Sequence, residues 1–479
     1  MNISVIVAMA YLFVTTIIII SYTQYKAKKQ DMKSFYLSSD GLGPVMITAL
    51  VFSEVVAAAQ VVGAAEAGFT TGLYAVWNNW GMALGIVMFL LITAKYCRAA
   101  GSARGSVTLA GALGEVMGFR GKLALTLVAT LTYMMFFASG PAALAGLFSP
   151  MLGVSRSTFI WILGVVYIIM GTFVGLKGLA VFNLLNTTLI FVSVAVACFG
   201  SVNLAGGLAN IRAVLPESYF NVFQPDPLTA IAGGLGTAFS AIAGPIYASV
   251  TLAAKSKRAN TTGQTAVIVM LVCFSFLISF LGIAAKVIMP DAPSSGIVYT
   301  IADYVSPVVG TLVLTAALAA SFSSGPSLLF LSAMALTRDC YGHFRPDMED
   351  RKERMIFRIV AIALGVVFIF MATTISSVFQ FVLGAFQIRS VIGIALALFF
   401  FWPRVTESSF FWSVIIGGIV AAGWFFSGSP LGVAPLWAGG AVTCVICIIT
   451  TLLSKEGSIS YSRKKYNEIM EEAKQKEVA

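Results

Sequence analysis

Charged residues are scarce in this sequence, and histidine is almost missing. Of 479 residues, 10% are Asp, Glu, Lys or Arg, whereas soluble domains carry roughly 25%. The single histidine, His343, lies in a charged segment and has no cluster of cysteine and histidine around it. The composition argues against a soluble fold, and a zinc site or a histidine-dependent triad has little support. We expect neither an enzyme nor an organic cofactor.

The cysteines also lack a pattern. They show neither the paired spacing of zinc ligands nor the framework of a disulfide-rich secreted domain. We interpret them as small residues inside a membrane. They are Cys97, Cys198, Cys273, Cys340, Cys444 and Cys447.

Long apolar runs are what the sequence has in abundance. Hydrophobic residues make up 58% of the chain, and runs of about 20 residues, enough to cross a bilayer as a helix, recur from end to end. The sequence therefore predicts an all-α integral membrane protein. About thirteen transmembrane helices are expected, at residues 3–22, 42–69, 72–95, 123–150, 157–176, 179–203, 228–253, 263–288, 305–335, 355–376, 378–402, 408–427 and 434–453.

The basic residues predict the orientation in the membrane. The net charge of +10 does not indicate nucleic acid, because Lys and Arg stand between the apolar runs, where they set orientation. No basic segment precedes the first span, and Lys26, Lys28, Lys29 and Lys33 follow it, which favours a retained helix with an outward N-terminus. Alternating sides from there puts 26 of the 30 basic residues inside. We expect a cell (inner) membrane protein with a cytoplasmic C-terminus.

Two expected spans are interrupted by small and helix-breaking residues. The second contains the run from Ser53 to Gln60 and then Gly63, and the seventh contains three glycines at 233–236 followed by Gly244-Pro245. Irregular backbone at membrane depth is tolerated where it lines a cavity, and matched interruptions five spans apart indicate inverted repeats around a central site. Close packing of small residues would explain either interruption alone.

These features divide the chain into four parts. We expect a first transmembrane helix and cytoplasmic linker at 1–40 and a transporter core at 41–404. Two additional helices follow at 405–454, and a cytoplasmic tail at 455–479. Within the core, 41–204 would be repeat one and 228–404 repeat two.

An ordered set of motifs resembles the sodium:solute symporter family. The motifs are DMKSFYLSSD at 31–40, QVVGAAEAGF at 60–69, GLKGLAVFNLLN at 175–186, and LAASFSSGPS at 318–327 with RDCY at 338–341. The resemblance covers nearly the whole chain. It implies a leucine-transporter-like fold of two five-helix inverted repeats plus extra helices. It also implies a sodium-coupled secondary active symporter that imports a small organic solute by alternating access.

The resemblance implies a sodium site built from the backbone oxygens of Ser53, Val56 and Ala320 and the hydroxyls of Ser323 and Ser324. A small hard cation takes about five or six oxygens, and hydroxyls with unwound-helix carbonyls supply them without a formal charge. The alternative is that the two serine hydroxyls bond back to their own helix.

A second sodium site, which some family members have, is not expected. Asn183 stands where those members often carry an acidic residue, and Pro326 stands where they offer a hydroxyl. One sodium ion per transport cycle is therefore the expected stoichiometry.

Glu54 and Arg389 are ionisable residues within expected spans. A charge near the bilayer centre costs about 2.5 kcal/mol or more, so each needs a partner or water. The resemblance places both helices beside the central cavity. Glu54 could receive a solute amine and Arg389 a carboxylate, which would favour an amino acid or another zwitterion. The two residues could instead pair with each other or face the cytoplasmic vestibule.

Further candidates for solute binding are neutral. Gln60 matches a substrate-contacting position in sugar-transporting relatives, and Gly244 marks the second helix break. Asn78 and Asn79, between Trp77 and Trp80, could add amide groups to an aromatic wall. An interfacial aromatic belt explains the tryptophans equally well. Sugar, amino acid, carboxylate and vitamin all stay open as solutes.

Two other functions compete with sodium symport. One is a proton-coupled transporter of the same fold with Glu54 as the proton carrier, and the other is a transporter-like membrane sensor. A channel would show a repeated filter or a charged ring. The expected partners are a small solute, a sodium ion and the lipid bilayer, and a monomer would suffice.

Overall fold

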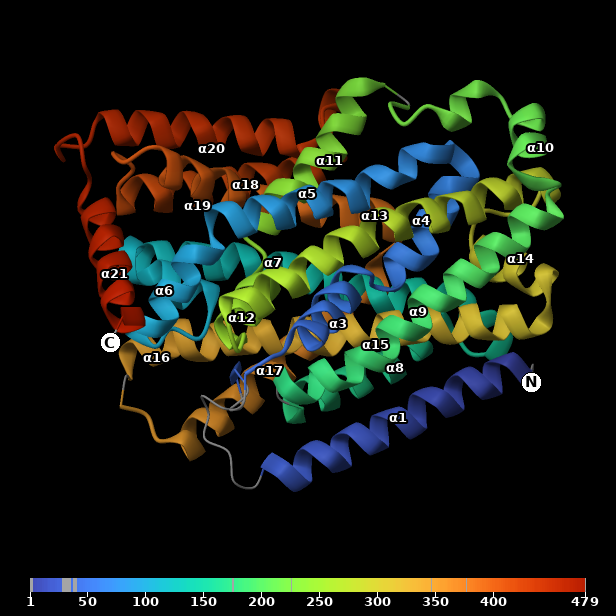
Figure 1. The fold of residues 1–479 in the computed structure, drawn as a ribbon, viewed down its shortest axis with the longest axis horizontal. Helices are drawn as coiled ribbons and strands as arrows, with labels where there is room; N and C mark the ends of the chain where they lie inside the picture. Colours follow the sequence, from blue (N-terminus) through green and yellow to red (C-terminus); the bar gives the residue numbers. More distant parts are fainter. Residues whose placement is uncertain are drawn as a thin grey trace.

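The chain forms an elongated bundle in which most helices run along the long axis (Figure 1). This computed structural model describes residues 3–27, 36–37, 41–174, 176–224, 226–345, 347–375 and 377–478. The N-terminal end of the bundle lies opposite the C-terminal end, as an odd number of passages requires. Lys28, Lys29, Lys33 and most of the motif at 31–40 lie outside the described residues.

The first half of the chain contains these helices: α1 (Ile3–Ala27), α3 (Pro44–Val55), α4 (Ala58–Thr71), η1 (Gly72–Ala75), α5 (Val76–Ile92), α6 (Ala94–Arg104), α7 (Leu109–Leu152), α8 (Arg156–Phe173), α9 (Leu176–Leu204), α10 (Gly207–Val214) and η2 (Glu217–Phe220). The second half contains α11 (Pro227–Ile242), α12 (Pro245–Ala253), α13 (Lys257–Ile288), α14 (Ile297–Val305), α15 (Pro307–Met334), η3 (Ala335–Tyr341), α16 (Gly342–Phe344), α17 (Asp350–Thr374), α18 (Val378–Phe401), α19 (Glu407–Phe426), η4 (Pro430–Gly432), α20 (Pro435–Leu452) and α21 (Tyr461–Val478).

The all-α prediction is confirmed. Eleven helices of the described residues are long and apolar enough to cross a membrane, and two shorter apolar helices accompany them at Ile3–Ile18 and Pro44–Val55. One of the eleven, Ala58–Ile92, contains both α4 and α5, which reverse direction at η1. With α3 and α4 joined as one passage and α5 taken separately, a helix or broken helix corresponds to each of the thirteen predicted spans.

The predicted connecting segments are more helical than expected. Residues 95–122 contain α6 and the start of α7, and short helices also occupy the segments before α11 and before α15. Local signals start and stop these helices: Gly105 ends α6 in the left-handed conformation, and the Thr108 hydroxyl accepts from the Gly111 backbone N–H at 2.7 Å to cap α7. A positive φ of 60° at Gly118 then kinks α7, which glycine allows without strain.

Both predicted helix breaks are present. The second passage is interrupted between α3 and α4, where Val56 has a non-helical ψ of 67°. The seventh is interrupted between α11 and α12, where Gly244 is extended and Pro245 begins the next helix. A short parallel backbone bridge places the start of the second passage beside the end of the seventh, because Leu42, before α3, bonds to Ala253 and Lys255, at the end of α12.

The glycines at 233–236 do not break the seventh passage, contrary to the prediction. They lie inside the regular helix α11. Gly234 lies under the ring of Trp77 from α5, and Gly236 lies against Gln387 from α18. Their role is therefore close helix packing, which small residues permit in membranes. The true break at 244–245 differs from these packing glycines because it contains a proline, which has no N–H to continue the helix.

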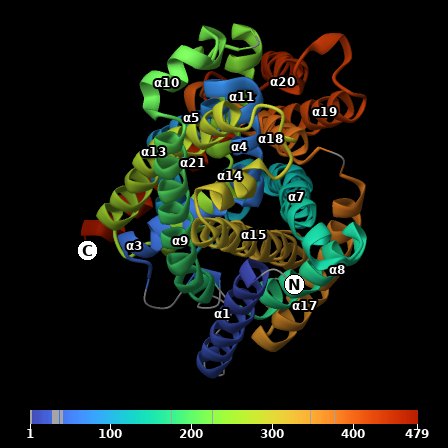
Figure 2. The ribbon, with the colours of Figure 1, turned by 90° about the vertical axis from the view of Figure 1, so that its right-hand side faces the viewer.

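The outer surface of the bundle is apolar. Large hydrophobic side chains on its outside are well exposed, for example Leu91 and Leu453 at 77% and Phe401 at 75%. Apolar exposure on this scale fits a protein surrounded by hydrocarbon. Viewed close to end-on (Figure 2), α1 and α10 lie at the margin, while α4 and α15 lie near the centre.

The last two parts of the chain pack on this bundle. Helices α19 and α20 pack against each other and against α18. The predicted tail folds into α21, which packs on α6. There Tyr466 stacks on Tyr96 with ring centroids 5.2 Å apart, and Arg104 pairs with Glu472 at 2.7 Å. The tail is therefore a structural element of the bundle.

Candidate functional site

The break after α3 leaves backbone carbonyl groups without helical partners. In an intact helix the carbonyl of Ser53 would accept from the N–H of Ala57, but the chain turns away at Val56. The Ser323 hydroxyl, from α15, donates to this carbonyl at 3.0 Å instead. Both residues are fully buried. The break in one repeat is thus tied directly to the serine-rich run of the other.

The α15 side of this contact is rich in oxygen. The carbonyl of Ala320 accepts from the hydroxyls of Ser323 at 2.9 Å and Ser324 at 3.0 Å. Pro326 has no N–H, so the carbonyl four residues before it also loses its helical donor. Four of the five residues expected for sodium binding, Ser53, Ala320, Ser323 and Ser324, are therefore joined by hydrogen bonds.

The fifth expected ligand, Val56, lies at the break itself. It is fully buried, and its N–H donates to the Phe52 carbonyl at 2.8 Å, which leaves its own carbonyl oxygen beyond the helix end. The C-terminal end of α3 carries the negative end of a helix dipole, which favours a cation. The serine hydroxyls do bond back to their helix, but Ser323 also reaches across to α3, so local bonding does not account for its whole role.

The position of Asn183 supports the expectation that a second sodium site is not present. Its side-chain amide donates to the Ser323 carbonyl at 3.4 Å, where a carboxylate could only accept. The Ser327 hydroxyl donates to the same carbonyl at 2.9 Å. This carbonyl therefore already accepts from two side-chain donors.

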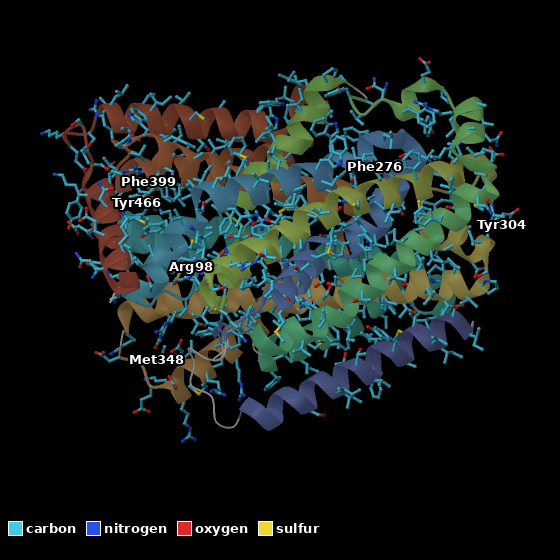
Figure 3. The ribbon with its side chains drawn as sticks, viewed as in Figure 1. Arg98, Phe276, Tyr304, Met348, Phe399 and Tyr466 are labelled. Atoms are coloured by element: carbon cyan, nitrogen blue, oxygen red, sulfur yellow. The ribbon has the colours of Figure 1, made fainter. Side chains whose placement is uncertain are left out.

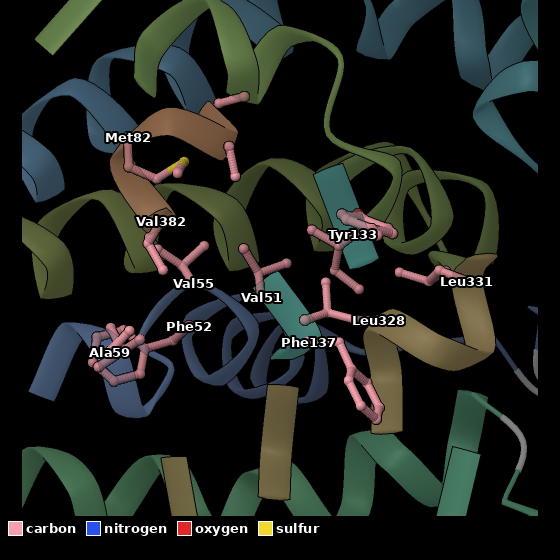
Figure 4. Close-up of a cluster of buried hydrophobic side chains, with 14 of the residues drawn as sticks. Val51, Phe52, Val55, Ala59, Met82, Tyr133, Phe137, Leu328, Leu331 and Val382 are labelled. Atoms are coloured by element: carbon pink, nitrogen blue, oxygen red, sulfur yellow. The ribbon is translucent and has the colours of Figure 1, made fainter. Parts of the chain in front are cut away.

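A small cavity of about 40 Å³ lies beside the α3 break. It is bounded by α3, α4, α5, α7, α12, α15 and α18, and Ala57 at the first helix break contributes to it. Apolar side chains from several of these helices meet beside it (Figure 4). The lining residues are Glu54, Val55, Ala57, Ala59, Gln60, Met82, Phe136, Ser139, Ile246, Tyr247, Leu328, Val382, Phe386 and Arg389.

Arg389 is held in place by aromatic rings and one hydroxyl. It is 5% exposed, its Nε donates to Ser240 Oγ at 2.6 Å, and its guanidinium lies 5.0 Å from the ring centre of Phe136 and 5.8 Å from that of Phe386. No oxygen of the described residues accepts from its terminal nitrogens. These nitrogens form the planar fork that matches a carboxylate.

Glu54 lies in the same cavity without pairing to Arg389. No ion pair within 4.0 Å joins the two side chains in the described part of the chain, and Glu54 Oε2 is buried with no hydrogen-bond partner there. A direct ion pair between Glu54 and Arg389 therefore does not fix the positions of these side chains. An unpaired buried carboxylate oxygen is costly, and it suits a site that a ligand or a proton completes.

The neutral candidates divide into two groups. Gln60 lines the cavity, and its Oε1 has no partner within the described ranges. Asn78, Asn79 and Gly244 do not line it, although Ile246 and Tyr247 just after Gly244 do. Asn78 and Asn79 lie one turn before Met82 on α5 and are buried.

The predicted tryptophan wall is wrong for this cavity. Trp77 instead donates from Nε1 to the Val222 carbonyl at 2.7 Å and contacts the rings of Trp80 and Phe223. It thereby anchors the segment before α11. The aromatic residues that do line the cavity are Phe136, Tyr247 and Phe386. No distinctive motif surrounds them, so the sequence does not mark them as cavity residues.

Comparison with known proteins identifies the family of the chain. The sequence profile of the sodium:solute symporter family matches residues 35–417. The chain belongs to the sodium:solute symporter family. The matched region contains both broken passages, the whole of α15 and the cavity-lining part of α18. The resemblance seen in the motifs is therefore confirmed.

Two similar proteins come from Bacillus subtilis (strain 168). The osmoregulated proline transporter OpuE is 23% identical over 479 residues, covering 95% of this chain and 96% of that protein. The high-affinity proline transporter PutP is 25% identical over 426 residues, covering 85% of this chain and 88% of that protein. The family and these relatives are transporters, so the chain is a multi-pass membrane transport protein and not an enzyme.

Solved structures establish the fold class. A Na⁺-coupled sialic acid symporter in a substrate-bound, outward-open state superposes with a TM-score of 0.75 at 14% identity, covering 94% of this chain and 98% of that chain. The nucleobase-cation-symport-1 family transporter Mhp1 in a closed conformation superposes with a TM-score of 0.60 at 16% identity, covering 90% and 97%. These proteins have the leucine-transporter-like fold, which confirms that prediction.

Proposed function

We propose that this symporter uses a sodium gradient to import a small zwitterionic solute, an amino acid or a close derivative. The observation that carries the proposal is that Glu54 and Arg389 line one cavity without pairing to each other. Opposite charges with free polar atoms offer a place for both ends of a zwitterion. The two proline transporters among its relatives also take an amino acid, which supports this solute class.

The structure suggests how Arg389 would select a carboxylate. Ser240 fixes Nε, and the rings of Tyr133, Phe136 and Phe386 pack on the guanidinium, so its orientation is set before solute arrives. A preorganised fork loses little entropy on binding. Sugars lack the planar anion that this fork matches, so they should bind weakly.

Sodium would act next to the solute. Glu54 follows Ser53 directly in α3, so the proposed ion ligands and the proposed amine acceptor share one helix end. An ion that binds between Ser53 and α15 would fix the end of α3 and thereby hold Glu54 in place. If both ligands select the same conformation, each must raise the affinity of the other by the same factor. Transport would follow from movement of repeat one against repeat two around this site.

Uptake into proteoliposomes tests the proposal. We expect labelled L-proline, or another amino acid from a panel, to accumulate when an inward sodium gradient is imposed and to fail when choline replaces sodium. A matched sugar and an uncharged amide should not accumulate. Uptake that needs no sodium, or that favours the sugar, would contradict the proposal.

Proton coupling is the second candidate, because Glu54 Oε2 is buried without a partner among the described residues. In that case an inward proton gradient alone should drive uptake, and a protonophore should abolish it. Under sodium coupling, a protonophore should leave sodium-driven uptake intact. The two mechanisms therefore give opposite results in one assay.

A further inference from the structure

A large cavity opens at the end of the bundle where α21 docks. Its volume is about 620 Å³, and it lies between the end of α5, α6, the start of α13 and the tail helix α21. It shares no residue with the cavity beside Glu54. Figure 3 shows Arg98, one of its lining residues, on the side of the bundle near α21.

One wall of this cavity is apolar and continuous with the outer surface. Val87, Leu90 and Leu91 from α5 and Ile268 from α13 line it. Leu91 is 77% exposed and Val87 is 37% exposed. Because α5 and α13 are membrane-spanning helices, this wall faces the hydrocarbon of the bilayer.

The other wall is basic. Lys95, Arg98, Lys257 and Lys474 all line the cavity, and they come from α6, α13 and α21. None of the four takes part in an ion pair with another described residue, and no carboxylate lines the cavity. The carboxylate of Glu472 on α21 is already paired with Arg104 at 2.7 Å. Four unneutralised cations thus face one space at the edge of the membrane.

The basic wall also contains a buried side-chain amide, that of Asn260. Asn260 is 2% exposed, and its side-chain oxygen accepts from Gln264 Nε2 at 2.8 Å and from Thr251 Oγ1 at 3.2 Å. Its amide nitrogen has no acceptor among the described residues, and Asn260 lines the cavity. The N-terminus of α13 begins here at Lys257, which adds the positive end of a helix dipole.

We propose that this cavity binds an anionic phospholipid, with its phosphate at the basic wall and its acyl chains along the apolar wall. Basic pockets between transmembrane helices at the cytoplasmic side suit such headgroups. A soluble anion would use the cations but not the exposed leucine and valine side chains. A lipid uses both, because the two walls meet at the level where headgroup and chains meet.

The bound lipid would join the tail to the transport core. Lys474 belongs to α21, whereas Lys257 belongs to α13, which packs on both halves of the first broken helix. A phosphate held between them would therefore stabilise the docked position of α21. This role does not depend on which solute is carried.

The test uses the full chain, purified in a neutral detergent and titrated with dioleoylphosphatidylglycerol, dioleoylphosphatidylcholine or inorganic phosphate. Native mass spectrometry measures bound lipid, and a thermal-shift assay measures stability. We expect the anionic lipid to bind about tenfold or more tightly than the neutral lipid and to raise the melting temperature, with affinity falling as salt is added. Inorganic phosphate at the same concentration should produce no shift.

A charge-matched pair of variants locates the site. Replacing Lys95, Arg98, Lys257 and Lys474 by Gln should weaken binding of the anionic lipid by about tenfold or more. Replacing Arg404, Lys455, Lys464 and Lys465 by Gln removes the same charge at basic positions that do not line the cavity, and it should leave binding unchanged.

Three results would overturn the proposal: equal binding of both lipids, an equal shift with inorganic phosphate, or equal loss in the two variants. If the first variant does not purify as a folded protein, Arg98→Gln with Lys257→Gln is compared with Lys464→Gln and Lys465→Gln by the same criterion.

Discussion

The Ser323 hydroxyl donates to the carbonyl oxygen of Ser53 over 3.0 Å, although 270 residues separate the two in sequence. The contact joins α15 to the free end of α3, which is the point where the first broken passage loses its helical hydrogen bonds. A cation placed here would take over carbonyl oxygens that hydroxyls now satisfy. The proposed ion site therefore lies at a junction between the two repeats.

Removing the two hydroxyls should weaken sodium binding. We expect Ser323→Ala with Ser324→Ala to raise the sodium concentration for half-maximal solute binding by about fivefold or more, because two oxygen ligands are lost. The measurement is solute binding to purified protein over a sodium titration. Ser332→Ala is the matched control, since its hydroxyl bonds back to Leu328 at 2.8 Å on the same helix, away from the break. Unchanged sodium dependence in the folded double variant would refute the assignment.

Close packing between α5 and α11 should make Gly81 intolerant of a side chain. A Cβ at Gly81 would overlap Thr237 Oγ1 and the Gly234 carbonyl. We expect Gly81→Ala to lower the melting temperature by several degrees, because backbone must move. Gly423→Ala, in α19 with nothing within 4 Å of the new atom, should leave it unchanged or slightly raised. Equal melting temperatures for the two variants would contradict this packing.

The predicted orientation puts the N-terminus outside and the C-terminus in the cytoplasm. Single cysteines introduced at positions 26–33 or 463–465 should resist a membrane-impermeant thiol reagent applied to intact cells and should react after the cells are opened. Arg212→Cys, on a predicted outer segment, is the positive control. Labelling of positions 463–465 from outside would show that the C-terminus is not cytoplasmic and that the predicted orientation is wrong.

Much of the fold could be predicted, because bilayer thickness fixes helix length and glycine-proline signals fix the breaks. The break at Gly244-Pro245 is an example, since proline cannot continue the ladder of hydrogen bonds. The glycines at 233–236 misled the prediction. A glycine that packs against Trp77 and one that breaks a helix look alike until the neighbouring helix is known.

The candidate site was only partly predictable. The motif at 318–327 led to Ser323 and Ser324, and burial cost led to Glu54 and Arg389. The residues that hold Arg389, such as Phe136 and Ser240, could not be found, because their role comes from tertiary contact with Arg389 and from no local pattern. The packing of α21 on α6 could not be predicted for the same reason: the sequence of a charged amphipathic tail does not indicate which helix it packs against.

The last prediction is that Glu54 and Arg389 bind the two charged ends of the solute. Each of Glu54→Gln and Arg389→Gln should weaken solute affinity by about tenfold or more, about 1.4 kcal/mol, because each removes one charged contact. Thermal stability should stay near that of the wild type. No nitrogen of Arg389 lies within 4.0 Å of a Glu54 carboxylate oxygen, so neither single change leaves behind a former ion-pair partner.

The double variant separates solute binding from a structural role. If the two residues support the fold through a longer-range pairing, each single variant should lose stability and the double variant should recover much of it, because no stranded charge remains. If they bind solute, the double variant should bind a zwitterion more weakly than either single variant and should show no recovery. Ser139→Ala, at a neutral cavity position whose hydroxyl donates to the Phe136 carbonyl at 2.7 Å, controls for general disturbance of the cavity.

Wild-type solute affinity in both single variants would contradict the proposal that the solute is a zwitterion. Recognition would then fall to Gln60 and the carbonyl groups freed by the helix breaks, which can hold an uncharged solute such as a sugar.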